Sequence, residues 1–168
     1  MKYFILILAF AFYLLGCKET PAPAKYVSVP EDFIIYSDED SVVCDIQTFI
    51  KQHDKTMFAL YNSDCSACIV GLSLWFNFAK EHPELTPVLS VYTEQSKRVF
   101  WLQNYTYYPA PIYAFFDKEF KFFLANKIQQ QHDTFIVDST GKIIVEGSIR
   151  DEKFKKDYLK YLKKQGKK

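Results

Sequence analysis

Two hydrophobic patterns alternate along most of the chain. Short, continuous apolar runs at 57–61, 87–92 and 112–116 predict buried β-strands. After the first run, residues 69–81 form a helical pattern that is apolar almost all round, which is typical of a helix enclosed in a layered fold. Residues 94–104 form a second, amphipathic helical pattern. Strands that alternate with helices in this way imply a core of parallel strands.

Further elements are expected on either side of this core. The apolar residues of 41–52 recur at helical spacing and predict a helix that carries Cys44 on its polar side. Two β-rich runs at 134–137 and 142–146 are joined by a short connection containing glycine, which favours a β-hairpin. Residues 151–164 have the apolar spacing of a final helix. Because the hairpin adds antiparallel strands, an α/β fold with a mixed sheet is expected.

The N-terminal pattern predicts export and lipid anchoring. Lys2 precedes an uncharged apolar run over 3–15, which has the length of a signal-peptide segment and is too short to span a bilayer. The run leads into Leu-Leu-Gly-Cys17, which resembles a bacterial lipobox. That resemblance implies a lipoprotein signal peptide over 1–16 and lipidation of Cys17 after cleavage. An ordinary secretory signal with an unrelated cysteine is the alternative.

A short polar segment separates this signal from the folded part of the chain. Residues 18–25 contain two prolines and no large apolar side chain, which predicts a semi-extended tether. The expected organisation is a signal peptide, then the lipidated cysteine and tether over 17–28, then one domain over 29–168. Such a protein would be lipid-anchored in the bacterial cell envelope, facing the periplasm or exposed at the surface, with the lipid bilayer as a partner through Cys17.

Composition supports a domain with its own core and argues against nucleic acid as a partner. Aromatic residues make up 18% of the 168 residues, enough to fill a core without disulfide staples. The formal net charge of +1 gives no general affinity for nucleic acid. The lysines gathered after residue 152 are explained more simply as the solvent-facing side of the last helix.

The four cysteines point to reactive thiols rather than to a disulfide framework. Cys65 and Cys68 form a Cys-x-x-Cys pair, after a predicted strand and at the start of the buried helix. A helix N-terminus stabilises a thiolate at Cys65, and Cys68 lies one turn further on. Attack by one thiolate and resolution by the other is the minimum requirement for disulfide exchange. Cys44 has no sequence partner and could be a surface thiol, a partly buried apolar residue or, least expected, a resolving thiol.

At these residues the chain resembles the thioredoxin superfamily, and within it the membrane-tethered TlpA/ResA-like thiol-disulfide oxidoreductases. Residues 57–68 are similar to the first core strand and active site of the family, and residues 134–145 to its late hairpin. Residues 112–116 would be the extra strand that this subgroup inserts. The resemblance implies a three-layer α/β/α sandwich with a mixed sheet. It also implies thiol-disulfide exchange without a cofactor, with envelope protein thiols or disulfides and a membrane electron donor as partners.

The active-site motif departs from the family pattern at two positions. Asp64 and Ala67 stand where the family usually has tryptophan and proline, around Cys65 and Ser66. A carboxylate ~6 Å away opposes ionisation of Cys65 by about 0.7–2.8 kcal/mol, depending on the dielectric constant, and the helix N-terminus favours it by about 0.3–2 kcal/mol. These effects roughly cancel, so we expect Cys65 not to be strongly acidified and the protein not to be a strong oxidant. Asp64 could instead simply cap the helix, as could Ser63.

The second departure concerns the cis-proline that the family places before the late strand, facing the dithiol. Aligning on Thr134 and Phe135 puts His132 at this position, followed by Asp133, whereas another register would use Pro111. Loss of the proline puts peptide recognition in question, because that proline leaves a backbone edge free for an extended substrate. An imidazole at this position could favour a thiolate or help to bind a metal.

Other functions of the dithiol stay open. Cys65 and Cys68 could form a structural disulfide, or could be inert in a domain that serves as an interaction module. Together with His132 they could hold Cu(I) or zinc in a metal carrier, since soft thiolates suit both ions. Copper-delivery proteins of this superfamily normally space their cysteines by three residues, which argues against that function. No separate metal site is predicted.

Overall fold

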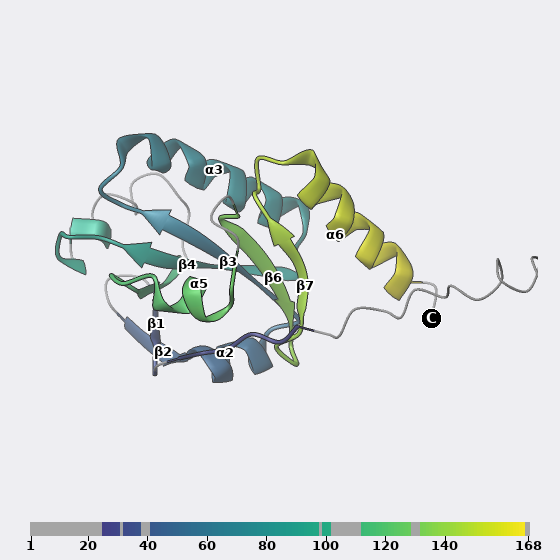
Figure 1. The fold of residues 1–168 in the computed structure, drawn as a ribbon, viewed down its shortest axis with the longest axis horizontal. Helices are drawn as coiled ribbons and strands as arrows, with labels where there is room; N and C mark the ends of the chain where they lie inside the picture. Colours follow the sequence, from purple (N-terminus) through teal and green to yellow (C-terminus); the bar gives the residue numbers. More distant parts are fainter. Residues whose placement is uncertain are drawn as a thin grey trace, which may run out of the picture.

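The computed structural model describes residues 25–30, 32–37, 41–97, 99–101, 112–128 and 132–166. It contains a seven-stranded sheet in the order β2-β1-β5-β4-β3-β6-β7 (Figure 1). The strands are β1 (Ile34–Ser37), β2 (Ser41–Asp45), β3 (Lys55–Asn62), β4 (Leu85–Tyr92), β5 (Tyr113–Phe116), β6 (Thr134–Asp138) and β7 (Ile143–Gly147). The labelled helices are α2 (Ile46–Gln52), α3 (Ser66–Glu81), α5 (Lys121–Ala125) and α6 (Glu152–Gln165).

The central strand, β3, joins a parallel half of the sheet to an antiparallel half. It pairs in parallel with β4, and β4 pairs in parallel with β5. On its other side β3 pairs antiparallel with β6, which forms a hairpin with β7. A second antiparallel hairpin, β1–β2, extends the edge next to β5. The parallel core and the late hairpin predicted from the sequence are both confirmed.

Helices cover both faces of this sheet. α3 and α6 lie together on one face (Figure 1), where Trp75 and Tyr158 belong to the same buried cluster as Met57 of β3. α2 and α5 cover the other face, where Phe49 and Phe122 share a second buried cluster with the neighbouring β3 residue, Phe58. Successive residues of β3 therefore alternate between two cores. This is the three-layer α/β/α sandwich with a mixed sheet that was expected.

The start of the predicted helix over 41–52 is wrong. Its first five residues form the edge strand β2, and α2 begins after them. Asp45 is the N-cap of α2, because its carboxylate accepts a hydrogen bond from Thr48 N at 2.9 Å. Val42 and Val43, which count toward the helical stripe, are β-branched and are 68% and 39% exposed. The local pattern could not reveal β1, the strand with which these residues pair.

Two elements, β1 and α5, have no clear signal in the hydrophobic pattern. β1 places Ile35 opposite Cys44 of β2, so Cys44 lies on a strand and is half-buried against the second core. α5 buries Phe122 and Phe123 in the same core. The helix predicted over 94–104 is described only in part.

The described chain begins with a segment held against the late hairpin. Val27 N donates a hydrogen bond to Gly141 O, and Ile143 N donates one to Lys25 O, both at 2.8 Å. Lys25 Nζ also forms an ion pair with Glu146 at 2.8 Å. Residues 25–28, which fall within the expected tether of residues 17–28, thus contact the domain directly.

Several predictions fall on parts of the chain outside the described residues. These are the signal peptide over 1–16, the lipidated Cys17, the tether before Lys25 and the alternative proline, Pro111. Within the described ranges, no helix has both the length and the apolar character needed to cross a bilayer.

Candidate active site

The dithiol lies where β3 passes into α3. β3 ends at Asn62, and Cys65 is the N-cap of α3 with an extended backbone (φ −106°, ψ 107°). The connecting turn is held by hydrogen bonds from Cys65 N to Asn62 O (3.4 Å) and from Asp64 N to Asn62 Oδ1 (2.9 Å). Cys68 N donates to Cys65 O at 2.9 Å within the first turn. The two cysteines are therefore presented together at the amino end of a core helix, as the sequence predicts.

The environment of Cys68 favours its protonated form. Both cysteines are of intermediate burial, and Cys68 packs against the core beneath α3. Burial raises the pKa of Cys68 to about 11, and a hydrogen bond to Cys65 together with the charge of a Cys65 thiolate adds to this rise. Arg150 acts in the opposite direction through its positive charge. Cys68 is thus a thiol that gives up its proton late, as suits a resolving residue.

Asp64 does not cap α3, and that interpretation is corrected. Its carboxylate instead accepts hydrogen bonds from Thr93 Oγ1 at 3.1 Å and from Glu94 N at 2.7 Å. The adjacent Ser63 N donates to Tyr92 O at 3.0 Å, so two successive residues fasten the active-site turn to the end of β4. A hydrogen-bonded negative charge therefore lies directly beside Cys65, as its place in the chain requires.

Asp133 connects the dithiol end of the sheet to the turn before α6. Asp133 O accepts a hydrogen bond from Leu60 N at 2.8 Å, which places the segment before β6 alongside the end of β3. Its carboxylate accepts hydrogen bonds from Thr134 Oγ1 (2.8 Å), Ser148 Oγ (3.1 Å) and Ile149 N (3.3 Å). Asp133 therefore has a structural role that the sequence alone does not reveal.

His132 lies near a carboxylate of the late hairpin. Its Nδ1 lies 3.9 Å from Glu146 Oε1, and this buried nitrogen has no hydrogen-bond partner among the described residues. Among those residues, no group of three or more His, Cys, Asp or Glu side chains is arranged to hold a metal ion. The set of Cys65, Cys68 and His132 that a copper or zinc carrier would need is therefore not assembled.

Comparison with known proteins identifies the fold. No protein-family model matches the sequence, and no curated protein is significantly similar to it. The exposed lipoprotein thioredoxin Etrx1 of Streptococcus pneumoniae is 19% identical, with a TM-score of 0.55 over 80% of this chain and 99% of that one. The thioredoxin domain of a thiol-disulfide oxidoreductase of Bacteroides vulgatus is 14% identical, with a TM-score of 0.53 over 83% and 96%. A thiol peroxidase of Chromobacterium violaceum is 12% identical, with a TM-score of 0.57 over 85% and 88%.

The chain has a thioredoxin-like fold. In this thioredoxin-like domain the dithiol follows the carboxyl end of the central strand, β3. Substrates of open α/β sheets usually bind at the carboxyl ends of the parallel strands. The position of Cys65 and Cys68 is therefore suited to contact with a partner molecule.

Two further residues belong to the surroundings of the dithiol and escaped the sequence analysis. Arg150, in the turn before α6, extends onto α3 at Gly71, where a methyl group added to the glycine would lie 3.0 Å from Arg150 Nη2. Gly71 follows Cys68 by one helical turn and lies on the same side of α3. The one available signal was that Arg150 is among only two arginines in a chain rich in lysine.

Cys44 is too far away to take part in exchange. Its strand, β2, lies four positions from β3 in the sheet, which corresponds to about 19 Å at the usual strand spacing. Burial, followed by the charge of Asp45, raises the pKa of the Cys44 thiol. The thioredoxin-like domain thus keeps this thiol apart from the dithiol and protonated.

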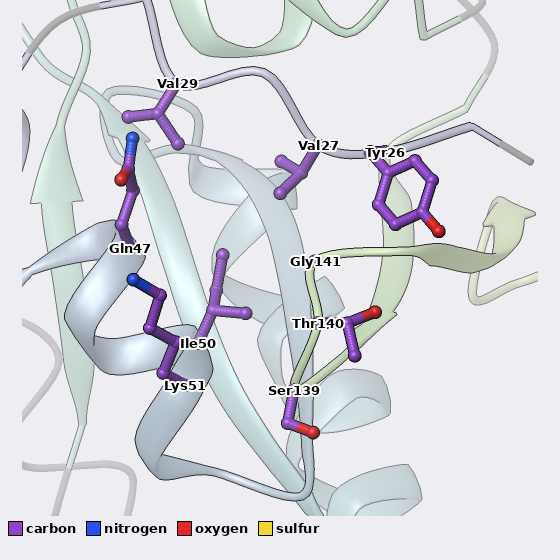
Figure 2. A pocket seen from close by; sticks show the side chains of 9 residues that line it. All are labelled: Tyr26, Val27, Val29, Gln47, Ile50, Lys51, Ser139, Thr140 and Gly141. Atoms are coloured by element: carbon purple, nitrogen blue, oxygen red, sulfur yellow. The ribbon is translucent and has the colours of Figure 1, made fainter.

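A cavity of about 260 Å³ lies at the end of β6 remote from the dithiol. Figure 2 shows its lining: α2 on one side, the β6–β7 turn on another, and the N-terminal segment along a third. Its polar side chains include Gln47, Lys51 and Ser139. None of its lining residues carries a thiol, an imidazole or a carboxylate, so it offers no chemistry that could serve disulfide exchange.

Proposed function

We propose that this thioredoxin-like domain exchanges disulfides with protein thiols through Cys65 and Cys68. The observation that carries the proposal is the asymmetry of the pair. Cys65 begins α3, where the helix N-terminus favours a thiolate, whereas Cys68 is kept protonated with a pKa of about 11. One thiol is thereby suited to attack and the other to resolution.

The exchange step follows from these two environments. The Cys65 thiolate attacks a substrate disulfide and forms a mixed disulfide, and one substrate sulfur leaves as a thiolate that takes up a proton. Cys68 then loses its proton to solvent and attacks the Cys65 sulfur, which releases the second substrate thiol. The dithiol gives up two electrons and the substrate disulfide gains them. With a dithiol substrate the same steps run in reverse, so no cofactor is required.

We further assign the protein to the bacterial envelope, as a lipoprotein of the TlpA/ResA-like kind. Support comes from the lipobox-like sequence ending at Cys17 and from the extra strand, β5, next to β4. Etrx1, a solved structure of similar fold, is itself named as an exposed lipoprotein thioredoxin. Envelope proteins would be the substrates and a membrane protein the electron donor. Labelled palmitate should be incorporated into the full chain and lost in Cys17→Ala.

The proposal is tested with cysteine variants of the full chain in an insulin-reduction assay. Cys65→Ser should lower the exchange rate by at least about a hundredfold, because the neighbouring Cys68 is held protonated by its raised pKa of about 11 and Cys44 lies on a distant strand. Cys68→Ser should accumulate a mixed disulfide on Cys65 that mass spectrometry detects. Cys44→Ser is the matched control and should stay within about twofold of the parent. Full activity in Cys65→Ser would disprove the assignment.

A further inference from the structure

Arg150 is an exposed residue whose guanidinium lies on α3. It belongs to the turn that joins β7 to α6, and its guanidinium lies against the backbone of Gly71. A methyl group at Gly71 would come within 3.0 Å of Arg150 Nη2, so glycine leaves the space that the guanidinium occupies. Since Cys68 lies one turn before Gly71, the positive charge is brought to the helix face of the resolving thiol.

The turn that carries Arg150 is held in place by Asp133, the residue directly before β6. Asp133 accepts hydrogen bonds from Ser148 Oγ and Ile149 N, and Arg150 N donates to Ser148 Oγ at 3.4 Å. Asp151 N donates to Ser148 O at 2.9 Å and completes the turn. The backbone on which Arg150 stands is therefore tied to the same end of the sheet as the dithiol.

The charge of Arg150 is not neutralised within the described part of the chain. No carboxylate among the described residues forms an ion pair with its guanidinium. The nearby Asp151 carboxylate is engaged with Lys153 N at 2.8 Å, as the N-cap of α6. An unpaired guanidinium beside a half-buried thiol can stabilise a negative charge there.

We propose that Arg150 assists the resolving step by stabilising the Cys68 thiolate as it forms, and that Gly71 and Asp133 are the positioning residues that place it there. This inference rests on the proposed exchange function. In the step concerned, the Cys68 thiol releases a proton to solvent, and its thiolate forms a bond to the Cys65 sulfur. The bond between Cys65 and the substrate sulfur breaks, and that sulfur leaves with the electron pair and is protonated.

The test follows the two half-reactions separately in the full chain with Cys17 and Cys44 replaced by serine. Dithiodipyridine, a neutral disulfide, releases one thiopyridone when Cys65 attacks and a second when Cys68 resolves the mixed disulfide. Using an uncharged probe avoids a direct effect of Arg150 on substrate binding. The rate of the second release is measured across pH in Arg150→Met, Arg150→Lys and the parent.

In Arg150→Met, the second release should be about three- to tenfold slower at neutral pH, with the midpoint of its pH profile moved upward. This is the size expected for a unit charge roughly 6–8 Å away at an effective dielectric constant of roughly 40–80. Arg150→Lys should restore at least half of the rate, because it keeps the charge. Gly71→Ala, whose methyl group would shift the guanidinium by only a few tenths of an ångström, should slow the same step by less than Arg150→Met does and should have no effect in the Arg150→Met background.

The outcomes separate this inference from the function on which it rests. If the parent releases only one thiopyridone, the exchange function itself fails. If the parent releases both and Arg150→Met has an unchanged pH midpoint, or if Arg150→Lys is as slow as Arg150→Met, the role of Arg150 is refuted. A loss of rate by the same factor at every pH would also refute the role of Arg150. Such a loss would indicate a structural effect, which does not move the pH midpoint of the second release.

Discussion

The two sides of the dithiol carry opposite charges. On the side of β4, the Asp64 carboxylate lies next to Cys65 and is held by Thr93 and Glu94. On the side of β7 and α6, the Arg150 guanidinium lies on α3 one turn beyond Cys68. Cys65 therefore has a negative neighbour, and Cys68 has a positive one.

The two neighbouring charges act on the ionisation of the two thiols in opposite directions. The acidic neighbour opposes a thiolate at Cys65, and the basic neighbour favours one at Cys68, so the electrostatic surroundings reduce the difference between them. A dithiol is strongly oxidising when its reduced form is stabilised by a very acidic thiol. We therefore expect a weak oxidant, in agreement with the interpretation drawn from Asp64 in the sequence.

The largest effect, on both folding stability and the resolving step, is expected from Asp133→Ala. The change removes the acceptor for three hydrogen bonds at the base of the Arg150 turn and should lower the free energy of unfolding by about 2 kcal/mol. It should also slow the resolving step, because Arg150 loses its support. Chemical denaturation and the two-step thiopyridone assay measure the two effects.

Asp138→Ala is the matched control for this variant. Asp138 accepts hydrogen bonds in the β6–β7 turn, at the other end of the same strand. Its loss should cost some stability and leave the resolving rate within about twofold of the parent. If both variants slow the resolving step equally, the effect of Asp133 is one of general stability.

A smaller effect, on the pH dependence of folding stability, is expected from the raised pKa of Cys68. An unfolded cysteine ionises near pH 9, whereas the pKa of Cys68 in the folded domain is about 11. Its contribution to stability is complete below about pH 9 and is lost as the pH rises toward 11, because only the unfolded state is ionised in that interval. Since Cys68 is partly exposed, we expect a loss of about 1–2 kcal/mol.

Denaturation curves of the parent and of Cys68→Ser across this pH range test the prediction. The difference between the two proteins removes the contributions of tyrosine and lysine, which also ionise there. The parent should lose more stability than Cys68→Ser between pH 9 and 11. Parallel curves would show that the folded state does not hold the Cys68 proton.

The smallest effect is expected on the reactivity of Cys65 when the negative charge of Asp64 is removed. Asp64→Asn removes the negative charge but keeps one oxygen to accept the hydrogen bond from Glu94 N, while its amide nitrogen can donate to Thr93 Oγ1 in place of the bond that Thr93 donates to the carboxylate. Alkylation of Cys65 at neutral pH should become about three- to tenfold faster, because its thiolate is no longer opposed. Thr93→Val, which removes one hydrogen bond and no charge, is the control and should leave the alkylation rate nearly unchanged. An unchanged rate in Asp64→Asn would mean that solvent screens this charge completely.

Local patterns predicted the central strand and the helix that packs on it, although α3 is not enclosed as expected and leaves Leu74 39% exposed. The apolar run at 57–61 lies within β3, and the helical pattern of 69–81 lies within α3, because a central strand and a core helix must be apolar wherever they pack. The same reasoning failed at 41–45, an edge strand with exposed valines. Edge strands depend on their partner, and β1 leaves no periodic signal of its own.

In the candidate site too, the sequence predicted the local features and missed the contacts between distant segments. The Cys65–Cys68 spacing at a helix start is a local feature, and its position is confirmed. The role of Asp64 was not predictable, since a residue before a helix can cap it or bind elsewhere, and here the partners are Thr93 and Glu94, about thirty residues away. Arg150 and Gly71 likewise meet only because α6 packs beside α3.

The sequence by itself determined that two thiols stand at the amino end of a core helix in an α/β domain, because strand, turn and helix signals are carried by neighbouring residues. Only the tertiary structure brought Arg150 to the side of α3 that carries Cys68 and fixed the Asp64 carboxylate against the residues after β4. Both arrangements join segments far apart in the chain, and electrostatic effects depend on distance in space, to which separation along the chain is no guide.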